Sequence, residues 1–137
     1  MNKATVPVLI SAMALTVIAT SYFLRPGSVL TTKAGLQVVI PTLNLTEQNG
    51  ERSFNTHCAS CHGVNAAGKA DLGPSFINKI YEPSHHGDDA FVLAAKNGVR
   101  AHHWRFGNMP PVLSASDNDL VDIIAYVRAI QKANGIY

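Results

Sequence analysis

Five consecutive residues, Cys58-Ala59-Ser60-Cys61-His62, restrict the fold of this chain more than any other part of its sequence. Two cysteines separated by two residues can add their sulfurs across the two vinyl groups of a porphyrin, and a histidine directly after them can reach the iron. The chain has 137 residues and only two cysteines, so both fall within the motif. The pattern therefore predicts one haem c, attached covalently through Cys58 and Cys61, with His62 as the proximal iron ligand.

Two other kinds of site use the same cysteine spacing. A redox-active dithiol is typical of a βαβ unit, and no such pattern surrounds the motif. A tetrahedral zinc site needs a second pair of ligands, for which His85-His86 or His102-His103 are available. Both alternatives explain less of the motif than haem attachment, because neither requires the histidine that directly follows the second cysteine.

A long apolar segment near the N-terminus indicates the compartment. Val6–Leu24 comprises 19 residues without an ionisable side chain, flanked by Lys3 and Arg25. As a helix this segment is roughly 28 Å long, close to the hydrocarbon thickness of a bilayer. The alternative, a cleaved signal peptide, has a shorter apolar region, and Ala19-Thr20-Ser21 is a weak cleavage site. The sequence therefore predicts an uncleaved signal-anchor transmembrane helix in residues 1–25.

The rest of the chain is long enough for one small domain. Residues 26–45 are rich in Pro, Gly and Thr and predict a linker, with a short extended piece around Gln37–Ile40. Residues 46–137 then form the globular domain. The formal net charge of +2 is too small to indicate a nucleic-acid surface.

Three helices are predicted in the domain, at about 46–57, about 88–96 and after Ser116. Thr46-Glu47-Gln48-Asn49 offers an N-terminal cap for the first helix. Ser116 and Asp119 form a capping-box pattern for the last one. Apolar residues follow that box at helical spacing: Leu120, Ile123, Ile124, Val127 and Ile130. Because no long alternating apolar run lies between the helices, the predicted class is all-α with long loops.

Together the motifs resemble those of the class I c-type cytochromes, over about residues 46–135. Asn49–Gly63 is similar to the family's first helix leading into the haem, and Leu72–Phe76 is similar to its Gly-Pro segment. Gly107–Pro111 resembles the loop that carries the distal methionine, and the helix with Tyr126 resembles the C-terminal helix. The resemblance implies a small class I cytochrome c-type fold around one covalent haem.

The same resemblance implies roles for single residues near the iron. The carbonyl of Pro74 accepts a hydrogen bond from the imidazole of His62, and Met109 is the distal iron ligand. Met109 lies 47 residues beyond His62, and the prolines after it stiffen its loop. His102 and His103 are the rival distal ligands, and an open distal site is the third alternative.

Further roles follow from the resemblance. Gly50 and Phe54 are expected to meet Tyr126 where the first and last helices cross. Trp104 is predicted to hydrogen-bond a haem propionate, and the alternative for it is aromatic packing. Arg105 is a second candidate for the propionate contact, and its alternative is exposure at the surface. Haem-wall candidates, each of them also compatible with an ordinary core position, are Leu72, Phe76, Ile77, Leu93, Val99, Phe106 and Leu113.

The resemblance also implies a function and a location. In this family haem is attached outside the cytoplasm, so the haem domain is expected in the periplasm, tethered by one pass through the bacterial inner membrane. The expected function is to carry single electrons between respiratory or photosynthetic membrane complexes, without enzymatic turnover, a small-molecule substrate or nucleic acid. One alternative is a permanently bound subunit of a dehydrogenase or terminal oxidase; another is a gas-binding or peroxidatic haem protein.

Overall fold

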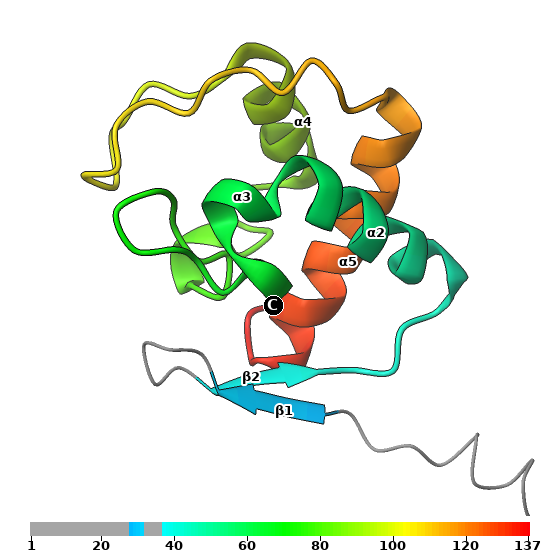
Figure 1. The fold of residues 1–137 in the computed structure, drawn as a ribbon. Helices are drawn as coiled ribbons and strands as arrows, with labels where there is room; N and C mark the ends of the chain where they lie inside the picture. The colour runs from blue at the N-terminus through cyan, green and yellow to red at the C-terminus, as the bar shows by residue number, and fades with distance from the viewer. Residues whose placement is uncertain (1–27, 32–36) are drawn as a thin grey trace, which may run out of the picture.

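The computed structural model describes residues 28–31 and 37–137, and within them helices pack around one core (Figure 1). The elements, in chain order, are β1 (Ser28–Thr31), β2 (Gln37–Ile40), α2 (Leu45–His57), α3 (Ala59–His62), the 3-10 turns η1 (Val64–Ala66) and η2 (Lys79–Tyr81), α4 (Asp88–Asn97) and α5 (Asp117–Ala133). Helices predominate, as predicted, but a two-stranded antiparallel sheet of β1 and β2 is added to the all-α class.

Helices α2 and α5 cross at Gly50, as the sequence predicted. A Cβ atom at this position would lie 1.9 Å from the carbonyl oxygen of Asp122 and 2.8 Å from Cβ of Tyr126. One turn later Phe54 packs against Tyr126, with ring centroids 5.5 Å apart, and both side chains are fully buried. A residue without a side chain is therefore needed where the two backbones touch.

The helix ends differ from the sequence prediction at one point. α2 begins at Leu45, and its capping box is formed by Asn44 with Glu47; the sequence analysis had instead placed the cap at Thr46–Asn49. The predicted capping box of α5, Ser116 with Asp119, is confirmed. α4 ends at Asn97, directly before Gly98, as expected.

Part of the predicted linker packs against the domain. Val38 in β2 is fully buried and belongs to the same hydrophobic core as α2 and α5. The side chain of Asn134, just after α5, accepts a hydrogen bond from the N–H of Val39 and donates one to its carbonyl, both at 2.9 Å. β2 is thus held by the end of α5. A side chain buried at Val38 and polar contacts at Val39 explain why a segment without helical pattern is ordered there.

The predicted transmembrane helix in residues 1–25 lies outside the described residues. Among the residues that are described, no helix has the length and apolar character needed to span a membrane.

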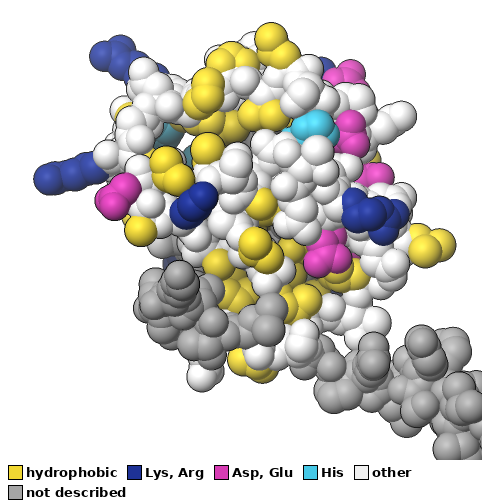
Figure 2. Space-filling model, viewed as in Figure 1, with side chains coloured by type: hydrophobic (Ala, Val, Ile, Leu, Met, Phe, Trp, Pro, Cys, Tyr) yellow, Lys and Arg dark blue, Asp and Glu magenta, His cyan; other side chains and the backbone are white. Residues whose placement is uncertain are grey.

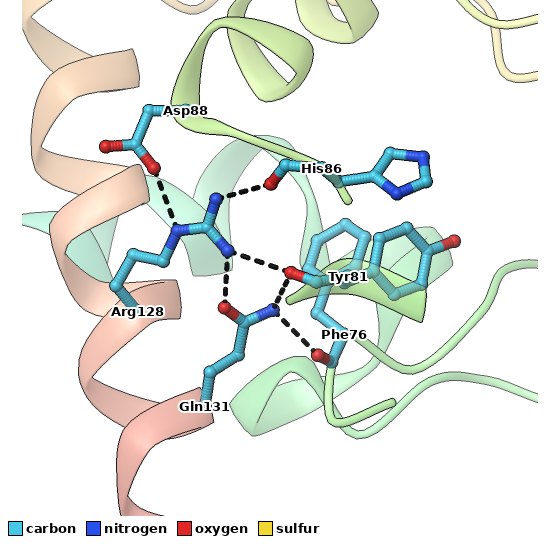
Figure 3. Close-up of polar contacts among 6 residues, drawn as sticks. All are labelled: Phe76, Tyr81, His86, Asp88, Arg128 and Gln131. Atoms are coloured by element: carbon cyan, nitrogen blue, oxygen red, sulfur yellow. Dashed lines mark hydrogen bonds and ion pairs between the residues drawn. The ribbon is translucent and has the colours of Figure 1, made fainter. Parts of the chain in front are cut away.

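A buried polar network fixes the chain between η2 and α4 onto α5 (Figure 3). The guanidinium of Arg128 donates to Asp88 Oδ1 at 2.8 Å, to the carbonyl of Tyr81 at 2.8 Å and to the carbonyl of His86 at 2.6 Å. Gln131, also buried, donates to the carbonyls of Phe76 and Tyr81 at 3.0 and 3.1 Å. These bonds satisfy loop carbonyls that no helix or sheet would satisfy, so the long loop keeps one path.

Candidate functional site

The cysteine motif sits on a single tight turn at the end of α2. The N–H of Cys58 donates to the carbonyl of Phe54 at 2.8 Å, and the N–H of His62 donates to the carbonyl of Cys58 at 2.9 Å. The short helix α3, Ala59–His62, therefore continues directly from α2 and carries Cys61 and His62 on one turn. Because α2 is anchored in the core by Phe54, the motif is placed by the most buried part of the molecule.

His62 is held in one orientation by its neighbours. Its Nδ1 lies 3.0 Å from the carbonyl oxygen of Pro74, and its ring stacks on Phe76 with centroids 4.3 Å apart. A carbonyl can only accept, so Nδ1 carries the proton and Nε2 keeps its lone pair. Burial lowers the pKa of His62 below its ordinary value, against the opposing effect of the Pro74 hydrogen bond. A neutral imidazole with a free Nε2 is the form that binds a metal.

The segment that supplies Pro74 approaches the motif closely. A Cβ atom on Gly73 would lie 2.7 Å from the carbonyl oxygen of Cys61. A side chain at this position would push the two segments apart and move the acceptor away from His62. Gly73 therefore lets this segment lie directly against the backbone of Cys61, and that contact places the carbonyl of Pro74 beside His62.

The motif and the Met109 segment line one cavity of about 500 Å³. Cys58, Cys61, His62 and Met109 all belong to its lining, most of which is apolar. Figure 2 shows hydrophobic side chains gathered around a hollow in the region where Figure 1 places α3 and the segments above it. Met109 is half-buried, and its backbone is bonded to Val99 by two hydrogen bonds of 2.9 Å. Two thiols, an oriented imidazole, a thioether and apolar walls are a donor set that fits a haem.

The thiol of Cys58 does not have the character of a redox nucleophile. Burial, assisted by the charge of Cys61, raises the pKa of Cys58 to about 11. Redox-active cysteines have a lowered thiol pKa, because the thiolate is the nucleophile. The zinc alternative gains no support either: among the described residues, the grouped metal-ligating side chains are His85, His86 and His103, and neither cysteine is among them.

Trp104 and Arg105 lie on the loop between Val99 and Met109. The indole Nε1 of Trp104 donates to the hydroxyl of Tyr81 at 2.8 Å, while the ring lines the cavity. Its N–H is thus engaged by a side chain, so the propionate contact expected from the sequence stays a prediction. Arg105 is exposed, the alternative weighed for it.

The haem-wall candidates divide into those that line the cavity and those that do not. Phe76, Leu93, Val99 and Phe106 line the cavity. Of the others, Leu72 and Leu113 are exposed, by 50% and 84%, and Ile77 packs against the hydrophobic core. Sequence reasoning did not predict the aromatic residues Tyr81 and Phe91, whose rings pack against Phe76 at 5.1 and 5.3 Å. The signal for them was present as two aromatic residues in the segment between the motif and the methionine loop.

Comparison with known proteins agrees with this arrangement. The family model described as Cytochrome c matches residues 47–131. Among solved structures, the chain is similar to cytochrome cL from the marine methylotroph Methylophaga aminisulfidivorans MPT, with 30% identity, 64% of this chain and 55% of that chain covered, and a TM-score of 0.49. It is also similar to the c-type cytochrome XoxG from Methylobacterium extorquens AM1, with 17% identity, 82% and 71% coverage, and a TM-score of 0.52. The chain thus spans just over half the length of the first of these. A search among curated proteins finds no match.

Proposed function

Because the chain belongs to the cytochrome c family, we propose that it is a membrane-tethered monohaem cytochrome that carries single electrons between membrane redox complexes. Membership of the family confirms the resemblance to class I c-type cytochromes. It also means that the chain binds haem c covalently and is a cytochrome c electron carrier; that it turns over no substrate is part of the proposal. The membrane tether, the residue roles and the identity of the complexes are the proposed parts.

Four side chains of the motif and the methionine loop would hold the haem. When bound, the haem supplies a one-electron couple between Fe(III) and Fe(II). Cys58 and Cys61 fix the porphyrin through thioether bonds, and His62 presents Nε2 to the iron. Met109 would supply the thioether that binds the iron from the methionine loop, a soft donor that would favour Fe(II) and so raise the potential.

One observation carries this proposal. The buried imidazole of His62 lies 3.0 Å from the carbonyl of Pro74 and forms part of the wall of the apolar cavity that Met109 also lines. The carbonyl fixes the ring and its tautomer, so the ligand needs no rearrangement when the oxidation state changes. The apolar walls exclude water and raise the energy of the more charged oxidised state. Both effects suit a carrier that must exchange electrons without structural change.

The proposal also assigns each part of the chain a place relative to the membrane. Residues 1–25 form the signal-anchor helix, residues 26–45 connect it to the haem domain, and residues 46–137 form that domain in the periplasm. The uncharged run Val6–Leu24 supports the tether. β2 packs against the domain and pairs with β1, so Ser28–Thr31 and Gln37–Ile40 of this connection belong to the folded unit.

The experiment that tests haem attachment is denaturing electrophoresis of the full chain followed by a haem stain. We expect the stain to follow the polypeptide, and the Cys58→Ala/Cys61→Ala variant to lose it. Wild-type protein without stain, expressed where haem is attached to other cytochromes, would contradict the proposal. N-terminal sequencing of the membrane fraction tests the tether: an intact Val6–Leu24 segment supports it, and a mature N-terminus near Tyr22 rejects it.

Purification in detergent separates the carrier from its alternatives. A carrier should elute alone, whereas a fixed subunit of a dehydrogenase or terminal oxidase should copurify in a constant ratio with larger chains. A gas-binding haem protein should bind CO in the ferrous state at neutral pH. A carrier with six ligands should not.

A further inference from the structure

Three histidines from two distant loops meet at one edge of the cavity. Each of His85, His86 and His103 has a ring nitrogen within 4.8 Å of a nitrogen of the other two. The ring centroids of His85 and His86 are 4.8 Å apart, and those of His86 and His103 are 5.5 Å apart. The cluster brings ring nitrogens from two loops into reach of a single ion.

His86 is held by its surroundings. Its Nδ1 lies 2.6 Å from the carbonyl of Ile80, which can only accept, so Nδ1 carries the proton and Nε2 is left with a lone pair. Its own carbonyl accepts a 2.6 Å hydrogen bond from Arg128, whose side chain is only 18% exposed (Figure 3). A histidine whose second nitrogen is bonded to a carbonyl is the usual form of a metal ligand in proteins.

The other two histidines are exposed and complete a surface site. His85 precedes α4 on the same loop as His86, and His103 reaches them from the loop between Val99 and Met109. Desolvation, together with the neighbouring charges of His102, His86 and His85, lowers the pKa of His103. His102 stacks on His103 with centroids 4.1 Å apart but is not part of the three-nitrogen group.

We propose that His85, His86 and His103 bind one Zn²⁺ ion at the edge of the cavity, with water in the fourth position. Three imidazoles and no carboxylate match the preference of zinc for nitrogen donors, whereas Mg²⁺ and Ca²⁺ require oxygen ligands. In a tetrahedral site the nitrogens are about 3.3 Å apart. Small rotations of the exposed rings of His85 and His103 towards the fixed His86 bring them to that spacing.

The ion would join the loop of His85 and His86 to the loop of His103. No hydrogen bond between these three histidines joins the two loops. One loop is tied to α5 through Arg128, and the other carries Trp104 and leads to Met109. The cross-link would hold the segment 100–108 closed over the cavity next to the contact of Trp104 with Tyr81. Zinc is then structural in this site, because it restrains a loop and takes no part in electron transfer.

The test is calorimetric titration of the haem-loaded protein, without a histidine tag, with Zn²⁺. We expect one ion per chain, no binding of Mg²⁺, and affinities about tenfold to 100-fold weaker for His85→Ala and for His103→Ala. Both rings are exposed, so both variants should fold. His57→Ala is the matched control, because its Nδ1 contacts Ser114 outside the cluster, and it should bind Zn²⁺ as the wild type does.

Two further measurements separate this site from chance binding. Zinc K-edge absorption should give three imidazole nitrogens at about 2.0 Å. Zn²⁺ should also slow tryptic cleavage after the exposed Arg100 and Arg105 in wild-type protein but not in His85→Ala. The proposal is overturned if His85→Ala and His103→Ala both bind Zn²⁺ as tightly as wild type, or if Zn²⁺ alters the visible haem spectrum, which would place a histidine of the cluster on the iron.

Discussion

Gly50 is the residue at which α2 and α5 come into contact. The intrinsic helix preference of Ala over Gly, about 1 kcal/mol, favours Gly50→Ala. The new Cβ would instead lie 1.9 Å from the carbonyl oxygen of Asp122, backbone that cannot move without shifting α5. We therefore expect Gly50→Ala to lower the free energy of unfolding by about 3 kcal/mol, measured by guanidinium titration. Asn55→Ala, an exposed position of the same helix, is the control and should be neutral; equal stability of both variants would refute the contact.

Met109 is the residue on which the distal assignment depends. If its thioether binds the iron, Met109→Ala should remove the sulfur-to-iron charge-transfer band of the oxidised protein, lower the reduction potential and allow the ferrous protein to bind CO. His102 and His103 line the same cavity and are the rivals. His102→Ala and His103→Ala are therefore the matched controls, and both should keep the band. If Met109→Ala left spectrum and potential unchanged while His102→Ala or His103→Ala altered both, the altered histidine would be the ligand; if none of the three altered them, the distal site would be open.

At the scale of single elements, a carboxyl group at the N-terminus of α5 makes the free energy of unfolding depend on pH in the acid range. Hydrogen bonds from Ser116 and Ser53 lower the pKa of Asp119 from 3.8 to about 2. Its ionised form is favoured in the folded protein, so its contribution is fully present above pH 4 and is lost as the pH falls through about 2. We expect Asp119→Asn to be less stable than wild type in urea at pH 7, with the difference shrinking between pH 4 and pH 2. Asp71→Asn, an exposed loop carboxyl, should show no such convergence.

Strand β2 gives a prediction with a matched pair of adjacent residues. Val38 is fully buried, whereas Val39 is 36% exposed. Truncating a buried valine loses about 2 kcal/mol of apolar burial, so Val38→Ala should lower the free energy of unfolding by that amount. Val39→Ala should change it by less than about 0.5 kcal/mol, because its hydrogen bonds to Asn134 use only the backbone. If both substitutions were neutral, β2 would not belong to the folded unit.

These elements also show how far a sequence specifies such a fold. Ser116 and Asp119 could be assigned as a cap because all partners lie within one turn. Asn44 was not identified as the cap of α2, although Glu47 stands three residues after it, a capping-box spacing that Thr46 lacks because its third residue is Asn49. An extended piece at Gln37–Ile40 lying against the domain could be predicted, but not the burial of Val38 in particular, because that depends on α5, which is remote in the sequence.

At the scale of the whole molecule, the site is assembled from three segments that the sequence separates widely. Cys58, Cys61 and His62 could be assigned by spacing, and Pro74 by the resemblance of its segment to the Gly-Pro segment of the family, because each motif is local. The contact of Trp104 with Tyr81 and the grouping of His85 with His103 were not predicted, since no local pattern records which loops meet. Site residues that lie within one segment can therefore be predicted from the sequence, whereas contacts between residues of different loops can be found only in the folded structure.

The last prediction concerns the haem as part of the core. The cavity that the motif and Met109 line measures about 500 Å³, in a domain whose hydrophobic core is small. Without haem the apolar walls of this cavity are exposed to water, and a small domain loses much of the apolar burial on which its stability depends. The haem-free Cys58→Ala/Cys61→Ala protein should therefore lose most of its helical circular dichroism and unfold without a cooperative transition. A haem-free protein that kept native helix content and a sharp thermal transition would show instead that α2 and α5 form a core that is stable by itself.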